Sequence, residues 1–208
     1  VPSPKILSKA FEEVKPNLIL TVPLILEKIY KKMILPQLSK TTMKVALNIP
    51  LLDSRIYAQI RKKLVDAFGG RFREVIVGGA AMNEEVTNFL YKIKFPFTIG
   101  YGMTECGPLI SYDHNDEYVP GSCGQILKGI MKVRIDSEDP CNKVGEIQVS
   151  GENVMKGYYK NEEATSKVFT EDGWLRTGDL GTIDADNRIY IRGRSKTMIL
   201  GASGQNIY

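Results

Sequence analysis

Short apolar runs alternate with helix-like spacings over the first 117 residues of the chain. The run at 18–22 predicts a buried strand, and the runs at 74–77 and 95–99 predict two more, each leading into glycine. Strands separated by helical stretches are typical of a parallel sheet with crossover helices. We therefore predict an α/β fold for residues 1–117, with ligand-binding turns at the carboxyl ends of the strands.

Three stretches around these strands have the apolar spacing of amphipathic helices. The first has its apolar face at Leu26, Ile29, Tyr30 and Met33 and should end at Pro36. The second has its apolar face at Ile56, Ile60, Leu64 and Phe68, and should begin at Asp53 or Ser54 and end at Gly69 and Gly70. The third has its apolar face at Val86, Phe89, Leu90 and Ile93 and should be capped by Asn83. The segment 39–52 has no periodic pattern, so we assign it no structure.

The pattern changes in the second half of the chain. Short strand-like runs at 132–135, 146–150 and 188–192 are separated by segments rich in turn-forming residues. This spacing predicts antiparallel hairpins. We expect residues 118–193 to form a small antiparallel β subdomain.

Composition and charge narrow the classes of protein that fit. The 208 residues are 43% hydrophobic and 25% charged, with a net charge of +4, as in ordinary globular proteins. The longest apolar runs are far shorter than the roughly 20 residues of a membrane span. Basic residues gather at 28–32 and 61–63, either as solvated helix faces or as a contact for a nucleotide, CoA or a membrane surface. No basic stripe interleaves with aromatic residues, so we expect no nucleic-acid partner.

The cysteines and the single histidine exclude several chemistries. Cys106, Cys123 and Cys141 lack the spacing of a metal site, and their odd number favours a reducing compartment, so we expect a cytoplasmic location. His114 is the only histidine, which rules out catalytic triads that use histidine and metal sites with several histidines.

The segment 100–105, GYGMTE, carries the most chemical information. Gly100 and Gly102 allow backbone to approach a flat ligand, and Tyr101 can stack on a base. Thr104 offers a hydroxyl to a phosphate oxygen, and Glu105 offers a carboxylate to Mg²⁺. Residue chemistry alone also fits a tight turn at the end of a strand.

Two later segments offer complementary groups. Asp179, beside Gly178, can accept hydrogen bonds from the two hydroxyls of a ribose. Arg194 can pair with ribose oxygens or with phosphate. Each residue taken alone also fits an ordinary surface turn.

The order and spacing of these pieces resemble one family. The segments 78–81 (GGAA), 100–105 (GYGMTE), 174–180 (WLRTGDL) and 193–196 (GRSK) follow one another, with Arg194 15 residues after Asp179. This arrangement resembles the adenylate-forming superfamily, which includes acyl-CoA synthetases, luciferase and adenylation domains. The continuation of the 100–105 motif and the stretch from residue 18 to residue 33 look most like bacterial long-chain fatty acid–CoA ligases.

The resemblance implies a role for each matching position. It places Gly79, Ala80 and Ala81 along the adenine pocket and acyl tunnel, and Gly100, Tyr101 and Gly102 against adenine. Thr104 would contact the α-phosphate and Glu105 would bind Mg²⁺. Asp179 and Arg194 would contact the ribose or phosphate, and Lys196 would lie at a hinge. Residues 194–208 would then begin a further domain. Thr104, Glu105 and Lys196 would be the residues closest to catalysis.

The implied reaction has two steps. A fatty acid carboxylate attacks the α-phosphate of ATP to form acyl-AMP and pyrophosphate, and CoA then displaces AMP, with Mg²⁺ offsetting the developing charge. An adenylation domain that loads a carrier protein, or a non-catalytic AMP- or ATP-binding module, would show the same motifs.

The family's phosphate-binding loop and its catalytic lysine have no counterpart in these 208 residues. We therefore expect the chain to be a fragment of a ligase that is inactive alone, with residues absent near 39–52. The sequence leaves open the acyl chain length, the oligomeric state and a peripheral membrane contact of the full-length protein.

Overall fold

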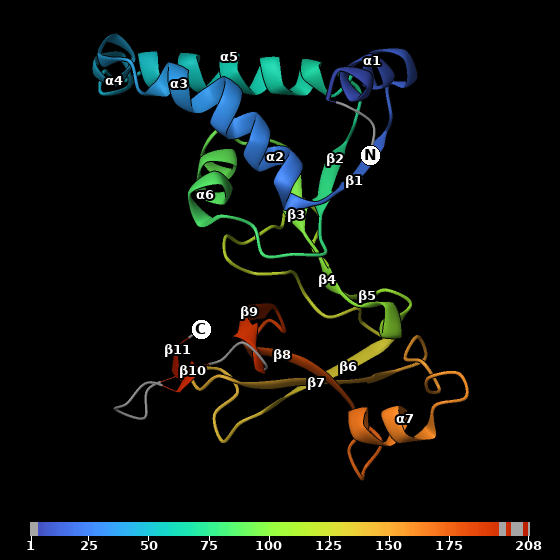
Figure 1. Cartoon of the computed structure of the whole chain (residues 1–208). Helices are drawn as coiled ribbons and strands as arrows, with labels where there is room; N and C mark the ends of the chain where they lie inside the picture. Colours follow the sequence, from blue (N-terminus) through green and yellow to red (C-terminus); the bar gives the residue numbers. More distant parts are fainter. Residues whose placement is uncertain (1–3, 196–198, 201–205, 208) are drawn as a thin grey trace. The chain divides into compact units, whose positions relative to one another are not determined.

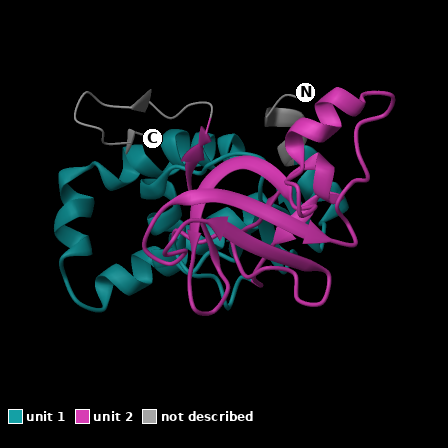
Figure 2. Ribbon diagram, turned by 90° about the horizontal axis from the view of Figure 1, so that it is seen from below, with its two compact units in different colours: residues 1–98, 115–120 teal, residues 99–114, 121–208 magenta. Residues whose placement is uncertain are grey.

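The computed structural model describes residues 4–195, 199–200 and 206–207 (Figure 1). The chain divides into two compact units (Figure 2): unit 1 contains Val1–Thr98 and Asn115–Pro120, and unit 2 contains Ile99–His114 and Gly121–Tyr208. We had expected subdomains at 1–117 and 118–193. The segment 99–114 instead belongs to unit 2, because Ser111 and Tyr112 hydrogen-bond with the backbone at 123–125.

A three-stranded parallel sheet forms the centre of unit 1. Its strands are β1 (Leu18–Thr21), β2 (Glu74–Val77) and β3 (Phe97–Ile99), in that order. The strands β1 and β2 run parallel, with Leu18 opposite Glu74. The predicted α/β fold is confirmed.

The first strand, predicted to be buried, is buried on one face only. Ile19 is buried, whereas Leu18 and Leu20 are exposed. The described chain therefore covers only one face of this edge strand. Strand β2, in contrast, buries Val75 and Val77 completely.

Helical elements supply the rest of unit 1. They are α1 (Pro4–Val14), α2 (Pro23–Ile29), the π-helix η1 (Tyr30–Ile34), α3 (Leu35–Leu38), α4 (Thr41–Leu47), α5 (Leu52–Ala67) and α6 (Glu84–Lys92). Within the described residues, no helix combines the length and the apolarity needed to cross a membrane.

Pro36 does not end the first predicted helix. The stretch continues to Leu38 through the π-helical turn, in which the Leu35 N–H donates to the Tyr30 carbonyl. Leu26, Tyr30 and Ile34 are buried at spacings of four residues, whereas Met33 is exposed. The wider π turn accommodates a proline that would interrupt a regular α-helix.

The other helix predictions differ in accuracy. Asn83 caps α6 through a 3.2 Å bond from the Val86 N–H, as predicted. Helix α5 begins at Leu52, one or two residues before the predicted cap, and ends before Gly69 and Gly70, which have positive φ. Helix α4 forms in the segment to which we assigned no structure, and it begins without a side-chain cap. Without such a cap, the sequence signal for its start is absent.

Unit 2 is built on an antiparallel sheet of four strands in the order β6-β7-β8-β9, and the predicted antiparallel architecture is confirmed. Its elements are β4 (Tyr101–Gly102), the 3₁₀-helix η2 (Thr104–Cys106), β5 (Leu109–Ser111), β6 (Met131–Asp136), β7 (Gly145–Gly151), α7 (Glu162–Val168), β8 (Leu175–Ile183) and β9 (Ile189–Arg194). A short pair, β10 (Ile199–Leu200) and β11 (Asn206–Ile207), follows. Neither α7 nor β8 was predicted from the sequence.

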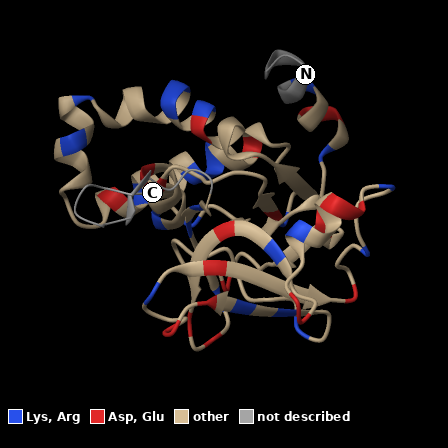
Figure 3. Ribbon diagram, turned by 60° about the horizontal axis from the view of Figure 1, so that its bottom comes forward, with Lys and Arg blue, Asp and Glu red and all other residues tan. Residues whose placement is uncertain are grey.

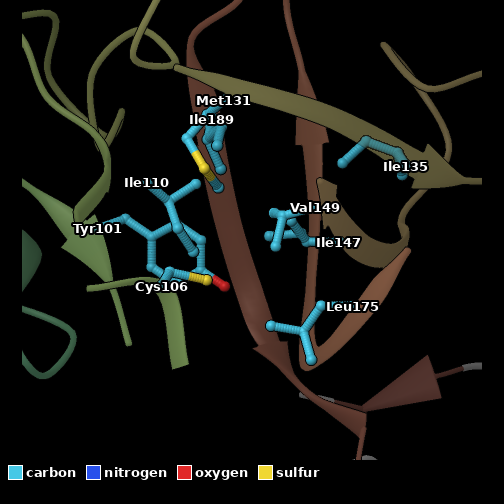
Figure 4. Packing of buried hydrophobic residues seen from close by; sticks show 9 residues of the cluster. All are labelled: Tyr101, Cys106, Ile110, Met131, Ile135, Ile147, Val149, Leu175 and Ile189. Atoms are coloured by element: carbon cyan, nitrogen blue, oxygen red, sulfur yellow. The ribbon is translucent and has the colours of Figure 1, made fainter. Parts of the chain in front are cut away.

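One apolar cluster holds this sheet against the β4–β5 segment (Figure 4). Its buried members are Tyr101, Cys106, Ile110, Met131, Ile135, Ile147, Val149, Leu175 and Ile189. Because Tyr101 and Cys106 belong to the GYGMTEC stretch, the cluster positions the candidate motif directly on the sheet.

Candidate functional site

The carboxylate of Asp179 joins three of the candidate segments within unit 2. The Tyr101 hydroxyl donates to Asp179 Oδ2 at 2.8 Å, although the residues lie 78 positions apart. Arg194 Nε lies 2.8 Å from the other carboxylate oxygen, Oδ1. Asp179 is only 6% exposed, whereas most of the Arg194 side chain is exposed. The structure therefore brings Tyr101, Asp179 and Arg194 together.

Strand pairing places Asp179 beside Arg194. Asp179 in β8 is directly opposite Arg194 in β9, and opposite residues of antiparallel strands project from the same face. The Asp179 N–H donates to Thr177 Oγ1 at 3.1 Å, and Ser195 Oγ donates to the Gly178 carbonyl at 3.1 Å. Asp179 therefore lies in strand β8 beside Gly178, which has a left-handed conformation (φ +72°), and the alternative of an ordinary surface turn does not apply.

Tyr101 is a neutral hydrogen-bond donor. Burial, together with the nearby Asp179 carboxylate, raises the pKa of Tyr101 far above its ordinary value. The phenol keeps its proton at physiological pH and orients the carboxylate. Its ring belongs to the apolar cluster and 6% of the residue remains exposed, so a stacking ligand would contact only that exposed part.

Asp179 retains capacity for a ligand. A carboxylate offers about four acceptor positions, two on each oxygen. Tyr101 and Arg194 each occupy one of the two oxygens. The arrangement can therefore accept two more donors, which matches the chemistry of a vicinal diol.

Glu105 is held by a tyrosine from the segment between β7 and α7. The Tyr158 hydroxyl donates to Glu105 Oε1 at 2.9 Å, and the Met155 N–H donates to the Glu105 carbonyl at 2.7 Å. Thr104 precedes it in η2 and is exposed. Among the described residues, no three His, Cys, Asp or Glu side chains gather as a metal site. A Mg²⁺ ion on Glu105 would take its remaining ligands from phosphate and water, as Mg²⁺ usually does.

The turn after Tyr101 has its own supports. Asn153 Nδ2 donates to the carbonyls of Cys106 at 2.6 Å and Leu109 at 2.9 Å. A Cβ on Gly102 would collide with the Pro108 carbonyl, so this position requires glycine. Sequence reasoning did not find Asn153, since an isolated asparagine in a loop carries no distinctive signal.

The remaining candidates are not part of this network. Gly79, Ala80 and Ala81 follow β2 in unit 1, where Gly79 has φ +84°. Gly100 immediately precedes β4 in unit 2. Lys196 lies outside the described residues.

The cysteines at 106 and 123 and the histidine at 114, among the described residues of unit 2, do not form a second catalytic centre. Burial raises the pKa of the Cys106 thiol and of the Cys123 thiol to about 11, which disfavours the thiolate needed for nucleophilic attack. His114 is exposed. An open hollow of about 860 Å³ contains none of the candidate residues and is lined by groups such as Arg134 and Asp172, which pair at 2.6 Å.

Comparison with known proteins supports one family. Residues 1–159 match the family described as AMP-binding enzyme. The chain is 29% identical to long-chain-fatty-acid–CoA ligase 1 of Saccharomyces cerevisiae over 94% of the chain, and 36% identical to 4-coumarate–CoA ligase 1 of Narcissus pseudonarcissus over 72%. It spans 30% of the length of each of these two relatives.

A solved structure of a related protein has the same fold. The fold superposes on ATP-bound MatB from Rhodopseudomonas palustris with a TM-score of 0.72, at 26% identity. The match covers 100% of this chain and 36% of MatB. The chain thus belongs to the AMP-binding enzyme family of the adenylate-forming superfamily, and represents part of such a protein.

Proposed function

We propose that the protein containing this chain is an ATP-dependent carboxylate–CoA ligase that activates a long-chain fatty acid through acyl-AMP. The observation that carries the proposal is the Tyr101–Asp179–Arg194 network. It presents a buried carboxylate with acceptor capacity for a ribose diol, next to a cation suited to phosphate or ribose oxygens.

Each motif then has a chemical role. Tyr101 and Asp179 bind the adenosine, with Gly100 and Gly102 allowing close approach. Thr104 contacts the α-phosphate, and Glu105, oriented by Tyr158, holds Mg²⁺. Gly79, Ala80 and Ala81 line the adenine and acyl region, and Lys196 acts at the hinge. Mg²⁺ supplies charge neutralisation during attack on the α-phosphate. CoA is the acyl acceptor, and the cysteine content supports a cytoplasmic enzyme.

Two observations bear on the acid substrate. The yeast fatty acid ligase aligns with 94% of the chain, so its similarity extends across both compact units. The coumarate ligase is more identical but aligns with 72%. We favour the long-chain fatty acid because the more extensive match includes the greater part of both units.

Pyrophosphate release by the intact natural protein tests the proposal. With ATP, Mg²⁺ and CoA, palmitate should support turnover better than 4-coumarate. Asp179→Asn should lower kcat/KM by about 10- to 100-fold, as expected when a charged hydrogen-bond partner is lost. Asp172→Asn is the matched control, because Asp172 also pairs with an arginine of the same sheet but lies outside the network.

Other results would redirect the assignment. Preference for 4-coumarate would replace the fatty acid, and transfer to a carrier protein in place of CoA would indicate an adenylation domain. Mg²⁺-dependent ATP binding without pyrophosphate release would indicate a non-catalytic module.

The 208-residue chain alone allows a simpler test. We expect it to bind AMP weakly and to release no pyrophosphate. Calorimetric titration with AMP should detect this binding, and Asp179→Ala should abolish it. Equal binding by the two proteins would remove Asp179 from the site.

A further inference from the structure

The positive charge of the chain comes from one segment of unit 1. The chain has 28 lysines and arginines and 24 acidic residues. Five lysines and no acidic residue lie between positions 28 and 52, so the rest of the chain carries 23 basic and 24 acidic residues. The five, all exposed, are Lys28, Lys31, Lys32, Lys40 and Lys44. A local excess of this kind indicates an anionic partner.

The same segment exposes aliphatic side chains. Val45 is 59% exposed, Ile49 48% and Leu51 80%, and Leu52 is also exposed. The segment contains one aromatic residue, Tyr30, and it is buried. The exposed surface therefore combines lysines with aliphatic groups and lacks the aromatic platforms of a single-stranded nucleic-acid site.

Helix α4 and the turn that follows it bring these groups together. Figure 1 shows α4 connecting α3 and α5, and Figure 3 shows basic residues along these helices. Lys44 and Val45 lie within α4, Lys40 is the residue at its N-terminal cap, and Ile49 directly follows its C-terminal cap at Asn48. Here we call residues 40–52 the α4 corner.

The backbone of the α4 corner includes an unusual leucine. Leu51 has φ +71°, a left-handed conformation that disfavours side chains other than glycine and asparagine. It is also the most exposed of these aliphatic residues. Its side chain is therefore available for contact with an apolar phase.

We propose that the α4 corner, with Lys28, Lys31 and Lys32, is a peripheral docking surface for a bilayer that contains anionic lipids. Lysines would contact lipid phosphates while Val45, Ile49 and Leu51 enter the interface between head groups and acyl chains. The absence of acidic residues from 28–52 suits a negatively charged surface, and the aliphatic side chains suit an apolar layer beneath it.

Co-sedimentation of the 208-residue chain with vesicles tests the proposal. Vesicles of phosphatidylcholine with phosphatidylglycerol should bind the chain, vesicles of phosphatidylcholine alone should bind it much less, and added salt should weaken the binding. The double change Lys40→Glu and Lys44→Glu should lower partitioning by at least about 25-fold, since each lysine near an anionic surface contributes about fivefold. Ile49→Ser with Leu51→Gly should weaken binding without changing the charge.

A matched control distinguishes the effect of the α4 corner on vesicle binding from the effect of the net charge of the chain. Lys132→Glu with Lys156→Glu makes the same charge change on exposed lysines of unit 2 and should leave partitioning within about twofold. Far-UV circular dichroism checks that each variant is folded. Equal loss in both double variants, or equal binding to both vesicle types, would overturn the proposal. So would capture of an oligonucleotide or an acidic protein by the corner in the absence of vesicle binding. The assay contains no ATP, so its result is independent of the proposed ligase reaction.

Discussion

The two compact units differ in how completely the chain covers its own apolar and polar groups. Of the fifteen large hydrophobic residues exposed in the described structure, twelve lie in unit 1 and three in unit 2. Unit 2 instead buries Ile110, Ile147 and Ile189 completely. It also links distant segments through Asp179, and through a buried ion pair between Asp113 and Arg188. Unit 2 thus covers more of its apolar surface with its own residues, whereas unit 1 retains exposed apolar surfaces suited to further contacts.

The largest expected difference is in the stability lost when an isoleucine is shortened in each unit. Ile147→Ala should lower the free energy of unfolding of unit 2 by about 4 kcal/mol, because it leaves a cavity in the cluster of Figure 4. Ile49→Ala in unit 1 should cost under about 0.5 kcal/mol. Urea denaturation followed by fluorescence of Trp174, the only tryptophan, reports on unit 2. Circular dichroism reports on both units. Similar losses at the two sites would remove the proposed contrast.

A second test breaks an ion pair inside unit 2. Asp113 Oδ2 accepts from Arg188 Nε at 3.0 Å, and Asp113 Oδ1 accepts from the Gln125 N–H at 3.1 Å. Asp113→Ala should lower the free energy of unfolding by about 3 kcal/mol, because it removes the buried hydrogen-bond partner of both the Arg188 guanidinium and the Gln125 N–H. Asp186→Ala is the control, since it removes an exposed carboxylate from the same arginine and should cost under about 1 kcal/mol. Equal costs, measured by denaturation, would show that burial does not decide the energy of this pair.

The pH dependence offers a third test of burial in unit 2. Burial, with a contribution from the Glu105 carboxylate, raises the pKa of Cys106 from 9.0 to about 11. Above pH 9 the unfolded thiol loses its proton before the folded one does, so its stabilising contribution is complete below pH 9 and lost as pH approaches 11. The stability difference between the parent and Cys106→Ala should therefore shrink by about 2 kcal/mol over this range.

The matched control for the loss of a thiol is Cys141→Ala, at an exposed position. Urea denaturation at a series of pH values measures both variants. A constant difference between the parent and Cys106→Ala from pH 9 to pH 11 would contradict the assignment of Cys106 as a buried thiol.

The smallest effect compares the two helix caps. Asn83 accepts from the Val86 N–H in unit 1, and Asn161 accepts from the Ala164 N–H in unit 2. Asn83→Ala should destabilise unit 1 by about 1 kcal/mol, because α6 buries one face. Helix α7 has no buried residue, so Asn161→Ala should only increase amide exchange within that helix. Loss of protection throughout unit 2 after Asn161→Ala would show that α7 supports the sheet.

The accuracy of the sequence predictions follows from the range of the interactions concerned. Strand β2, helix α6 and the cap at Asn83 were predictable, because their signals lie within a few residues. Helix α4 was not, since it begins without a capping side chain. The continuation past Pro36 depends on a π turn that buries Tyr30, whose hydroxyl donates to Glu85 55 residues away at 2.9 Å. No local pattern contains such a contact.

The sequence by itself determined the order of the motifs, the alternation of strands and helices, and the concentration of lysines between 28 and 52, since these are properties of residue order. Only the tertiary structure decided which oxygen of Asp179 meets Tyr101 and which meets Arg194. It also decided that Tyr158 orients Glu105 and that Leu51 is exposed in a left-handed conformation. These features depend on strand register and on packing between distant segments, which short-range periodicity does not encode.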